Sequence, residues 1–579
     1  MNEGHICQCL SRISSLRRDA PVTISGNQRK TGGQLVDGVL RLARGLSELG
    51  VRRGDVVAIA ALNSDSYLEW LLAIAYVGGI SAPLNYRWSF EEATSALESV
   101  RPVMLVVDES CHLWSLQLQK SENKKLLCLR SHVFLGDPPS SLSNTENVLS
   151  TNAIKKPLEG APAPDYLWAS EGIALICFTS GTTGRPKGVA ISHTALIVQS
   201  LAKIAIVGYR ENDVYLHTAP LCHIGGISSC MALLMVGGCH VFIPRFEAKS
   251  AVQAIEQHHV TTLITVPAMM ADLVSYHSCY VLLTFEALIR EKKTWMGGEM
   301  VKKILNGGGG LSVELIKGAT RIFPNAKILS AYGMTETCSS LTFMTLHDPT
   351  LQNSGKFIPK NFEGSKDSIL HSSGIYVGKP APHVELCISS GGSLDYGPAS
   401  GRILTRGAHV MDGYWDGFAA VVPESSKHGW FDTGDIGWID DQGDLWLMGR
   451  MKDRIKSGGE NVYPQEVEAV LSQHPGVSAV VVFGVPDARL TEMVAACVQL
   501  KESWQWIGHY SNVPRKGEQI LSVRTLQDYC KMRNLTGFKI PKNFICWKKP
   551  FPVTSTGKLR RDEVKREALS HFQFITSNL

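Results

Sequence analysis

FTSGTTGRPKGVAISH, the stretch from Phe178 to His193, combines glycines and hydroxylated residues with a single lysine, Lys187. It directly follows the apolar run Gly172 to Cys177, so it is predicted to be a loop that leaves a strand. Small residues let backbone amides approach phosphate oxygens closely, while hydroxyl groups donate from the sides. We therefore expect a phosphate-binding loop. The expected contacts come from Thr179, Ser180, Gly181, Thr182, Thr183, Gly184 and Lys187.

A Walker A loop is the first alternative, and it needs Gly-x-x-x-x-Gly-Lys followed by Ser or Thr. Counted from Gly181, Pro186 stands in place of the second glycine and Gly188 in place of the magnesium-binding hydroxyl. Pro186 also removes a backbone donor where such a loop needs one. The Walker A interpretation therefore fails. A flexible surface loop would leave the unbroken run Thr179 to Gly184 unexplained.

The composition indicates an ordinary soluble globular protein with two or more domains. The chain has 579 residues, 44% of them hydrophobic, and a mean hydropathy near zero. A formal charge of +5 is too small at this length to predict binding to nucleic acid or to an acidic membrane surface. The most apolar stretch, Leu71 to Ile80, is far shorter than the roughly 20 residues of a membrane span. The fourteen cysteines show no zinc-ligand spacing, so reduced thiols are expected.

The first part of the chain alternates between helix and strand patterns. A helix is predicted from Gly33 to Leu49 with Gly50 as its C-cap, then a buried strand from Val56 to Leu62 and a helix from Tyr67 to Tyr76. This alternation predicts an α/β fold with a mostly parallel sheet covered on both faces. Further predicted strands are Val103 to Val107, Val214 to Leu216, His240 to Ile243, Leu263 to Val266 and Ile328 to Leu329.

A change in composition near residue 450 predicts a domain boundary. Before it, the sequence alternates like paired strands with a turn at Asp440 to Gly443. After it, RIKSGGENVYPQEVEAVLSQHPGVSAVVVFGVPD reads as a loop, a helix and a strand of a small α+β unit. The predicted domains are therefore residues 1–450 and 451–579.

FTSGTTGRPKGV resembles the nucleotide loop of the acyl-adenylate-forming, or AMP-binding, superfamily, which includes acyl-CoA synthetases, peptide-synthetase adenylation domains and luciferases. The resemblance implies a large N-terminal domain of β-sheets flanked by helices and a small mobile α+β C-terminal domain. NGGGGLS, Asn306 to Ser312, takes the place of the family's Gly-Gly-Ala-Pro-Leu loop, which lines the adenine and acyl sites through Gly308 and Gly309. Here Gly309 and Gly310 stand where Ala and Pro are usual.

AYGMTE, Ala331 to Glu336, resembles the family segment that stacks on adenine and binds magnesium. Tyr332 would offer an aromatic face to the base, next to Gly333 and Met334. Thr335 would donate to the α-phosphate, and Glu336 would supply a hard oxygen ligand to Mg²⁺. Alone, such a hexapeptide is equally consistent with a turn after a strand.

The family motifs continue in order toward the C-terminus. By resemblance, Asp435 of DTGD accepts the ribose hydroxyls, since a carboxylate suits two donors, and Arg450 also reaches the ribose. Lys558 of TSTGKLRR would contact the carboxylate and bridging oxygens during adenylation. The resemblance places Lys452 at the hinge between domains, and the coenzyme A arm beside Ser457, Gly458 and Gly459.

Several stretches resemble one branch of the superfamily, the plant-type 2-succinylbenzoate–CoA ligases. Among them are DGVLRLARGL, SAPLNYRW, LHTAPLCHIGGISS and NLTGFKIPKNF. The branch forms a thioester on the pathway to phylloquinone from a carboxylic acid, ATP with Mg²⁺, and coenzyme A. One departure is the segment 277–300, where a hydrophobic run from Tyr280 to Phe285 replaces an expected polar loop near the acyl pocket.

The second carboxylate of 2-succinylbenzoate requires a cation or several donors in the pocket. His223 and Lys203 are the candidates, together with Gly308 of the glycine loop. The motifs leave open another aromatic or medium-chain acid, and luciferase-type oxidation. A domain that loads a carrier protein is expected to continue beyond Lys558 into a carrier segment. A non-catalytic relative is expected to lack Lys558, Glu336 or Asp435.

The C-terminal Ser577-Asn578-Leu579 is similar to the Ser-Lys-Leu peroxisomal address, with Asn in place of the usual cation. Ser11 to Arg18 faintly resembles a transit peptide, although Met1 lies too close to the predicted domain for a complete one. The expected location is the peroxisome, the chloroplast or both. The expected partners are small molecules, with no nucleic acid and no membrane span.

Overall fold

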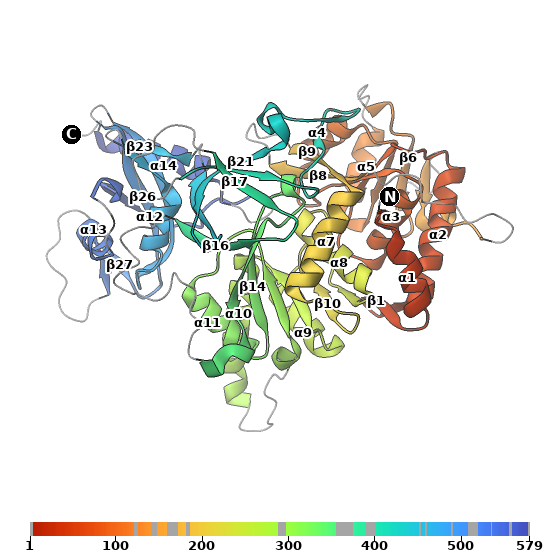
Figure 1. Ribbon diagram of the computed structural model, residues 1–579, viewed down its shortest axis with the longest axis horizontal. Helices are drawn as coiled ribbons and strands as arrows, with labels where there is room; N and C mark the ends of the chain where they lie inside the picture. The colour runs from red at the N-terminus through yellow and green to blue at the C-terminus, as the bar shows by residue number, and fades with distance from the viewer. Residues whose placement is uncertain are drawn as a thin grey trace. The chain divides into compact units, whose positions relative to one another are not determined.

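The computed structural model divides the chain into two compact units (Figure 1). Unit 1 comprises Met1–Pro359, Gly378–Glu385 and Arg406–Phe431, and unit 2 comprises Lys360–Val377, Leu386–Thr405 and Asp432–Leu579. The predicted boundary at residue 450 stays a prediction. The structure describes residues 4–120, 126–140, 147–158, 172–180, 186–287, 297–354, 374–389, 400–450, 453–457, 460–487, 490–507, 519–533, 535, 537–554 and 559–576.

The described part of unit 1 contains a sheet of nine strands in which the centre is parallel. Only β9, β19 and β20, at one edge, run antiparallel to their neighbours. In spatial order the strands are β20 (Ala420–Val421), β19 (Gly413–Trp415), β9 (Pro186–Ser192), β8 (Ile173–Ser180), β4 (Ile80–Pro83), β3 (Val56–Ala60), β5 (Met104–Val107), β6 (Ser131–Phe134) and β7 (Val148–Ser150).

A second row of strands in unit 1 is parallel from β14 to β1 and ends in antiparallel strands on both sides. The central pairing aligns Ile304 with both Leu263 and Ile328, and all three side chains are buried. In spatial order the strands are β15 (Thr342–His347), β14 (Lys327–Tyr332), β13 (Lys303–Asn306), β12 (Thr262–Thr265), β10 (Val214–His217), β11 (Cys239–Phe242), β1 (Pro21–Ser25) and β2 (Gln28–Thr31).

Helices flank these strands, as the sequence predicted (Figure 1). The predicted helix at Gly33 to Leu49 is α2, and its periodic residues Leu35, Val39, Leu42 and Leu46 are fully buried. The helices of unit 1 are α1 (Gln8–Leu16), α2 (Gly32–Glu48), α3 (Asp65–Tyr76), α4 (Phe90–Val100), α5 (His112–Gln119), α6 (Thr151–Ile154), α7 (His193–Val207), α8 (Ile224–Val236), α9 (Ala248–His258), α10 (Pro267–Ala287) and α11 (Val313–Ile322).

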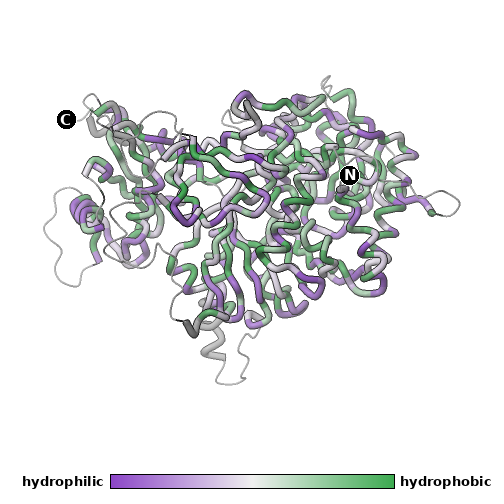
Figure 2. The backbone as a smooth tube through the Cα atoms, viewed as in Figure 1, coloured by the Kyte–Doolittle hydropathy of each residue, from purple (hydrophilic) through white to green (hydrophobic). Residues whose placement is uncertain are grey.

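The atypical segment 277–300 begins inside a helix rather than a loop. Helix α10 runs from Pro267 to Ala287, and so contains the hydrophobic run Tyr280 to Phe285. A 3-10 helix, Gly297–Met300, ends the segment directly before β13. Among the described residues no helix is long and apolar enough to cross a membrane, and hydrophilic residues are interspersed with hydrophobic ones along the chain (Figure 2).

Unit 2 contains the hairpin β21 (Phe431–Ile439) and β22 (Leu445–Arg450), with the predicted turn at Asp440 to Gly443 between them. Beyond residue 450 the predicted helix and strand are confirmed as α12 (Pro464–Leu471) and β25 (Val477–Asp487), but the predicted loop before them is wrong, because β23 (Ile455–Ser457) and β24 (Glu460–Val462) pair antiparallel there. The strands form a sheet packed on helices. The other elements there are β26 (Thr491–Leu500), β27 (Gln505–Trp506), β28 (Ile520–Leu521), α13 (Val523–Met532), β29 (Asn543–Cys546) and α14 (Arg561–Thr576). The strands before the hairpin are β16 (Ile375–Pro380), β17 (Glu385–Ser389) and β18 (Gly401–Arg406), and their residues are divided between the two units.

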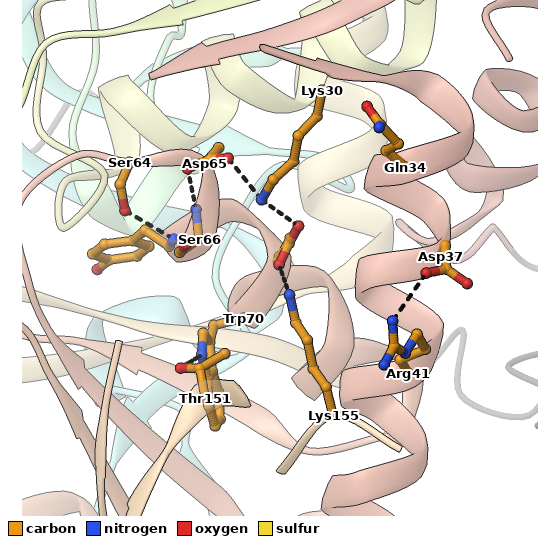
Figure 3. A network of polar contacts seen from close by, with 12 residues as sticks. Lys30, Gln34, Asp37, Arg41, Ser64, Asp65, Ser66, Trp70, Thr151 and Lys155 are labelled. Atoms are coloured by element: carbon orange, nitrogen blue, oxygen red, sulfur yellow. Dashed lines mark hydrogen bonds and ion pairs between the residues drawn. The ribbon is translucent and has the colours of Figure 1, made fainter. Parts of the chain in front are cut away.

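A buried charge network joins α3 to two other segments of unit 1 (Figure 3). The Glu69 carboxylate, 1% exposed, lies 2.7 Å from the Nζ atoms of both Lys30 and Lys155, and Lys30 also contacts Asp65 at 2.7 Å. A Cβ atom on Gly38 of α2 would lie 2.6 Å from Glu69 Oε1. The network therefore explains a glycine in the middle of a helix, where its lack of a side chain otherwise costs stability.

We predict that Glu69→Gln lowers the free energy of unfolding by roughly 2–3 kcal/mol, because it leaves Lys155 without its carboxylate in a largely buried position. The estimate is below the full cost of breaking a buried pair, since the lysine side chains are 23% and 19% exposed. Asp37→Asn, which removes an exposed i,i+4 pair with Arg41 on α2, should cost below about 0.5 kcal/mol. Urea unfolding of both variants gives the comparison, and equal small losses would contradict a structural role for Glu69.

Candidate functional site

The predicted phosphate loop connects β8 to β9. These strands pair antiparallel, with Thr179 opposite Lys187 and Ser180 opposite Pro186. Lys187 is therefore the second residue of β9, held by the pairing of β9 with β8, and it is exposed. Residues 181–184 lie outside the described residues, so their predicted contacts with phosphate stay predictions.

AYGMTE leaves the end of β14 and continues into a short 3-10 helix, Thr335–Thr337. The turn is tight because the Tyr332 carbonyl accepts from the Leu341 amide at 2.7 Å. A Cβ atom on Gly333 would lie 1.8 Å from the Ser339 carbonyl oxygen, so only glycine fits there. Tyr332 and Thr335 are both half-buried. The loop therefore holds these side chains on a closed and specific backbone path.

The glycine loop after β13 leaves the same edge as AYGMTE, because β13 and β14 are parallel neighbours with Asn306 opposite Ser330. Asn306 Nδ2 donates to the Gly309 carbonyl at 2.7 Å, and Gly308 has a φ of 72°, which favours glycine. A Cβ on Gly310 would meet no atom within 4 Å. The proline that is usual in the family would therefore fit at position 310, and Gly310 leaves this space open.

Tyr414 of β19 contacts both the β8–β9 hairpin and AYGMTE. Its hydroxyl donates to Glu336 Oε1 at 3.1 Å, while Lys187 Nζ lies 5.3 Å from the centre of its ring. The amide of Met411 also donates to the Glu336 carbonyl at 2.9 Å. The structure thus brings together two predicted site residues that are distant in sequence. Sequence reasoning missed Tyr414, because no local pattern connects it to either of them.

Glu336 fits the magnesium role that the sequence predicted. It is a half-buried carboxylate whose position is fixed through both its side chain and its backbone. Carboxylate oxygen is the ligand type that Mg²⁺ prefers, and the ion usually takes one or two protein carboxylates together with substrate phosphates. Bound there, Mg²⁺ would neutralise charge on nucleotide phosphates held beside Lys187.

Lys203 is fully buried on α7, with 0% of its surface exposed. Its Nζ donates to the hydroxyls of Ser228 at 2.6 Å, Ser229 at 3.1 Å and Ser339 at 3.3 Å. Burial lowers the pKa of Lys203 to about 7. Within the described part of the chain, no carboxylate forms an ion pair with it. The site is therefore a buried amine with polar but uncharged partners.

The partners of Lys203 connect it to the predicted acyl site. Ser228 and Ser229 lie on α8, which begins directly after His223. Ser339 follows AYGMTE and has a φ of 108°, a left-handed conformation that is strained for a residue with a side chain. Burial, with a smaller effect of Arg87, lowers the pKa of His223 to about 4, so this imidazole is neutral. Of the two predicted candidates, Lys203 is therefore the one able to carry charge.

In unit 2, the register of β21 and β22 places Asp435 opposite Arg450. Arg450 Nε lies 3.1 Å from Asp435 Oδ1, and the Asp435 side chain is 4% exposed. The two predicted ribose-binding residues are therefore adjacent. Ser457 is buried at the end of β23, opposite Thr491. Lys452, Gly458, Gly459 and Lys558 lie outside the described residues, so their roles stay predictions.

One buried group that the sequence did not predict consists of His217, Cys230 and His240. Its three possible metal-ligand atoms lie within 4.8 Å of one another. The two imidazoles already share a hydrogen bond of 2.9 Å, and Phe242 stacks on His217 with ring centres 4.1 Å apart. Burial lowers the pKa of both histidines. The group is accounted for as a neutral aromatic part of the core.

Comparison with known proteins gives two family matches. The AMP-binding enzyme family matches residues 11–415, and the AMP-binding enzyme C-terminal domain matches residues 466–558. A 2-succinylbenzoate–CoA ligase of Arabidopsis thaliana, described as chloroplastic/peroxisomal, is 54% identical over 583 residues, with 99% of each chain covered.

Solved structures agree with the fold. The o-succinylbenzoate CoA synthetase MenE of Bacillus subtilis, in complex with the acyl-adenylate intermediate OSB-AMP, is 26% identical with a TM-score of 0.71, and the match covers 98% of this chain and 99% of that one. The same synthetase in complex with ATP and magnesium ion is 26% identical with a TM-score of 0.69, covering 96% and 99%. The predicted fold of sheets flanked by helices, followed by a smaller C-terminal domain, is confirmed.

Proposed function

The chain belongs to the AMP-binding enzyme family, and from that premise we propose that it is an ATP-dependent 2-succinylbenzoate–CoA ligase of phylloquinone biosynthesis. The succinyl carboxylate attacks the α-phosphorus of ATP, which forms the acyl-adenylate and releases pyrophosphate. The thiol of coenzyme A then attacks the acyl carbon, releases AMP and leaves the thioester. The 54% identity over the whole chain and the solved complex with OSB-AMP support this reaction.

The buried amine of Lys203 carries the choice of substrate. After the succinyl carboxylate has reacted, 2-succinylbenzoate still has a second carboxylate on its ring. A charge-assisted hydrogen bond to an ammonium group is stronger than one between neutral groups. Lys203 has three hydroxyl partners but no carboxylate partner among the described residues. The ring carboxylate of the substrate would supply this counter-charge. A ligase for a mono-acid gains nothing from such a group.

For the adenylation step, the predicted residues of each unit have a proposed task. Lys187 and the phosphate loop hold the phosphates, Tyr332 contacts adenine, Thr335 donates to the α-phosphate, and Glu336 holds Mg²⁺. In unit 2, Asp435 and Arg450 hold the ribose. Their adjacency at 3.1 Å supports a shared ligand, since the carboxylate accepts from hydroxyls while the guanidinium orients it.

The C-terminal domain, residues 451–579, is proposed to serve both steps by turning about Lys452. Lys558 would stabilise charge during adenylation. The pantetheine arm would then pass beside Ser457, Gly458 and Gly459 during thioester formation. The α+β elements there share a hydrophobic core, which supports movement as one unit.

The location proposed is that given for the Arabidopsis thaliana relative, the chloroplast and the peroxisome. We further propose that Ser577-Asn578-Leu579 acts as the peroxisomal address, on its similarity to Ser-Lys-Leu.

Lys203→Met is predicted to lower kcat/KM for 2-succinylbenzoate about a hundredfold, because a buried charge contact is lost. The matched control is 4-oxo-4-phenylbutanoate, which keeps the succinyl arm and lacks the ring carboxylate. Its kcat/KM should change little. Equal losses for both acids would show that Lys203 only supports the fold.

The same contact predicts a pH dependence. Burial lowers the pKa of Lys203 to about 7, and the adjacent Cys338 thiol stays neutral because burial raises its pKa to about 12. As the pH rises above 7, the ammonium fraction falls by about tenfold per pH unit. For wild type, kcat/KM of the diacid should fall along this limb, whereas that of 4-oxo-4-phenylbutanoate should not.

Lys558→Ala should slow pyrophosphate exchange about 10²–10³-fold, because a positioned cation stabilises the adenylation transition state. It should still convert supplied acyl-adenylate and coenzyme A to thioester. Gly459→Leu should do the reverse, since a side chain obstructs a close backbone approach. The test assays each half-reaction separately for both variants. Similar losses in both half-reactions for both variants would refute alternation of the C-terminal domain.

A fluorescent protein fused to the N-terminus, which leaves Leu579 terminal, should give punctate peroxisomal fluorescence in plant cells. Deletion of the last three residues should disperse it, because the receptor reads the terminal tripeptide. Puncta that survive the deletion would rule out this address.

A further inference from the structure

Tyr414 holds a position between two oppositely charged residues of the proposed nucleotide site. Strand β19 pairs antiparallel with β9, and Tyr414 stands opposite Val189. Side chains alternate along a strand, so Lys187 and Val189 point to the same face of β9. Tyr414 is therefore a diagonal cross-strand neighbour of Lys187, in reach of a long side chain. This geometry places the ammonium 5.3 Å from the ring centre.

The other end of the same side chain reaches Glu336. The phenol donates to Glu336 Oε1 at 3.1 Å, and the backbone of the same segment donates from Met411 to the Glu336 carbonyl at 2.9 Å. An ionised carboxylate only accepts hydrogen bonds, so the Tyr414 hydroxyl is the donor of this pair.

The arrangement prevents an unproductive ion pair. A lysine and a glutamate that flank the same ligand attract each other, and direct contact would neutralise the charges that ATP and Mg²⁺ need. Among the described residues, Lys187 and Glu336 form no ion pair. Instead, the face of the Tyr414 ring contacts the Lys187 ammonium, and the Tyr414 hydroxyl donates to the Glu336 carboxylate. One side chain thus gives each charge a partner and keeps the two charges apart.

We propose that Tyr414 is a positioning residue that holds Glu336 ready for the divalent cation and Lys187 ready for the nucleotide phosphates. The proposal rests on the roles given to those two residues in the proposed function. Tyr414 itself touches neither metal nor phosphate in this account. Its loss should therefore weaken binding of the metal–nucleotide complex and leave recognition of the acid unchanged.

The test measures binding of Mn²⁺ by electron paramagnetic resonance, with a non-hydrolysable ATP analogue and no acid present. Tyr414→Phe removes only the hydroxyl and should weaken Mn²⁺ about tenfold, the effect of one hydrogen bond to a charged group. Tyr414→Leu also removes the ring face, so it should additionally weaken the nucleotide. KM for the carboxylic acid should stay within about twofold of wild type in the phenylalanine variant.

The matched control is Trp415→Phe on the same strand. Trp415 points to the opposite face, and its indole nitrogen has no hydrogen-bond partner among the described residues. This variant should bind Mn²⁺ and nucleotide like wild type. A Mn²⁺ loss in Trp415→Phe equal to that in Tyr414→Phe would show that the strand, and not the hydroxyl, matters, and would overturn the proposal.

A double-mutant cycle with Glu336→Gln separates positioning from general destabilisation. If Tyr414 acts through Glu336, then Tyr414→Phe should have little further effect on Mn²⁺ binding in the Glu336→Gln background. The same tenfold loss in both backgrounds would overturn the proposal. Wild-type protein that binds no Mn²⁺–nucleotide complex would refute the proposed function instead, so the two failures are distinguishable.

Discussion

Parallel pairing of β10, β12, β13 and β14 sends the segments that follow these strands to one edge of the sheet, and the site in unit 1 depends on this constraint. The segment after β10 leads to His223, the glycine loop follows β13, and AYGMTE follows β14. Ligands bind in such sheets outside the carboxyl ends of the strands. The register therefore determines which loops can share a ligand, before any side chain contributes specificity.

Two buried charged residues, Glu69 and Lys203, have different kinds of partner. Glu69 receives two lysines at 2.7 Å, so the charge is satisfied within the fold. Lys203 receives only hydroxyls, and burial lowers its pKa to about 7. A buried amine without a counter-charge costs stability, and a protein gains from it when a ligand supplies the missing anion. The contrast supports a structural role for Glu69 and the proposed contact of Lys203 with a dicarboxylic acid.

Much of the fold follows from local patterns in the sequence. The helical spacing of Leu35 to Leu46 predicted α2, and the apolar run at Val56 predicted β3 with an end two residues too late. The small α+β elements after residue 450 were predicted from the same periodicities. The segment from Tyr280 to Phe285 was expected to differ from a polar loop, and it belongs to α10. Helix length there could not be predicted, because the apolar run has no clear stop signal.

The site was only partly readable from the sequence. AYGMTE and the phosphate hairpin are local motifs, so their residues could be named in advance. Tyr414 could not, because its proposed role depends on the pairing of β19 with β9, which joins residues far apart in the chain. Lys203 was one of two candidates, and only packing distinguishes them. Its partners come from α8 and from the turn after AYGMTE, which bring three hydroxyls to one amine.

The most direct measurement is a crystal structure of the protein with a stable analogue of 2-succinylbenzoyl-adenylate. A ring carboxylate oxygen should lie about 2.7–2.9 Å from Lys203 Nζ, the distance of a charge-assisted hydrogen bond. The serine hydroxyls should remain its other partners. A ring carboxylate that points to solvent or binds a different cation, while Lys203 keeps only its three serines, would contradict the account.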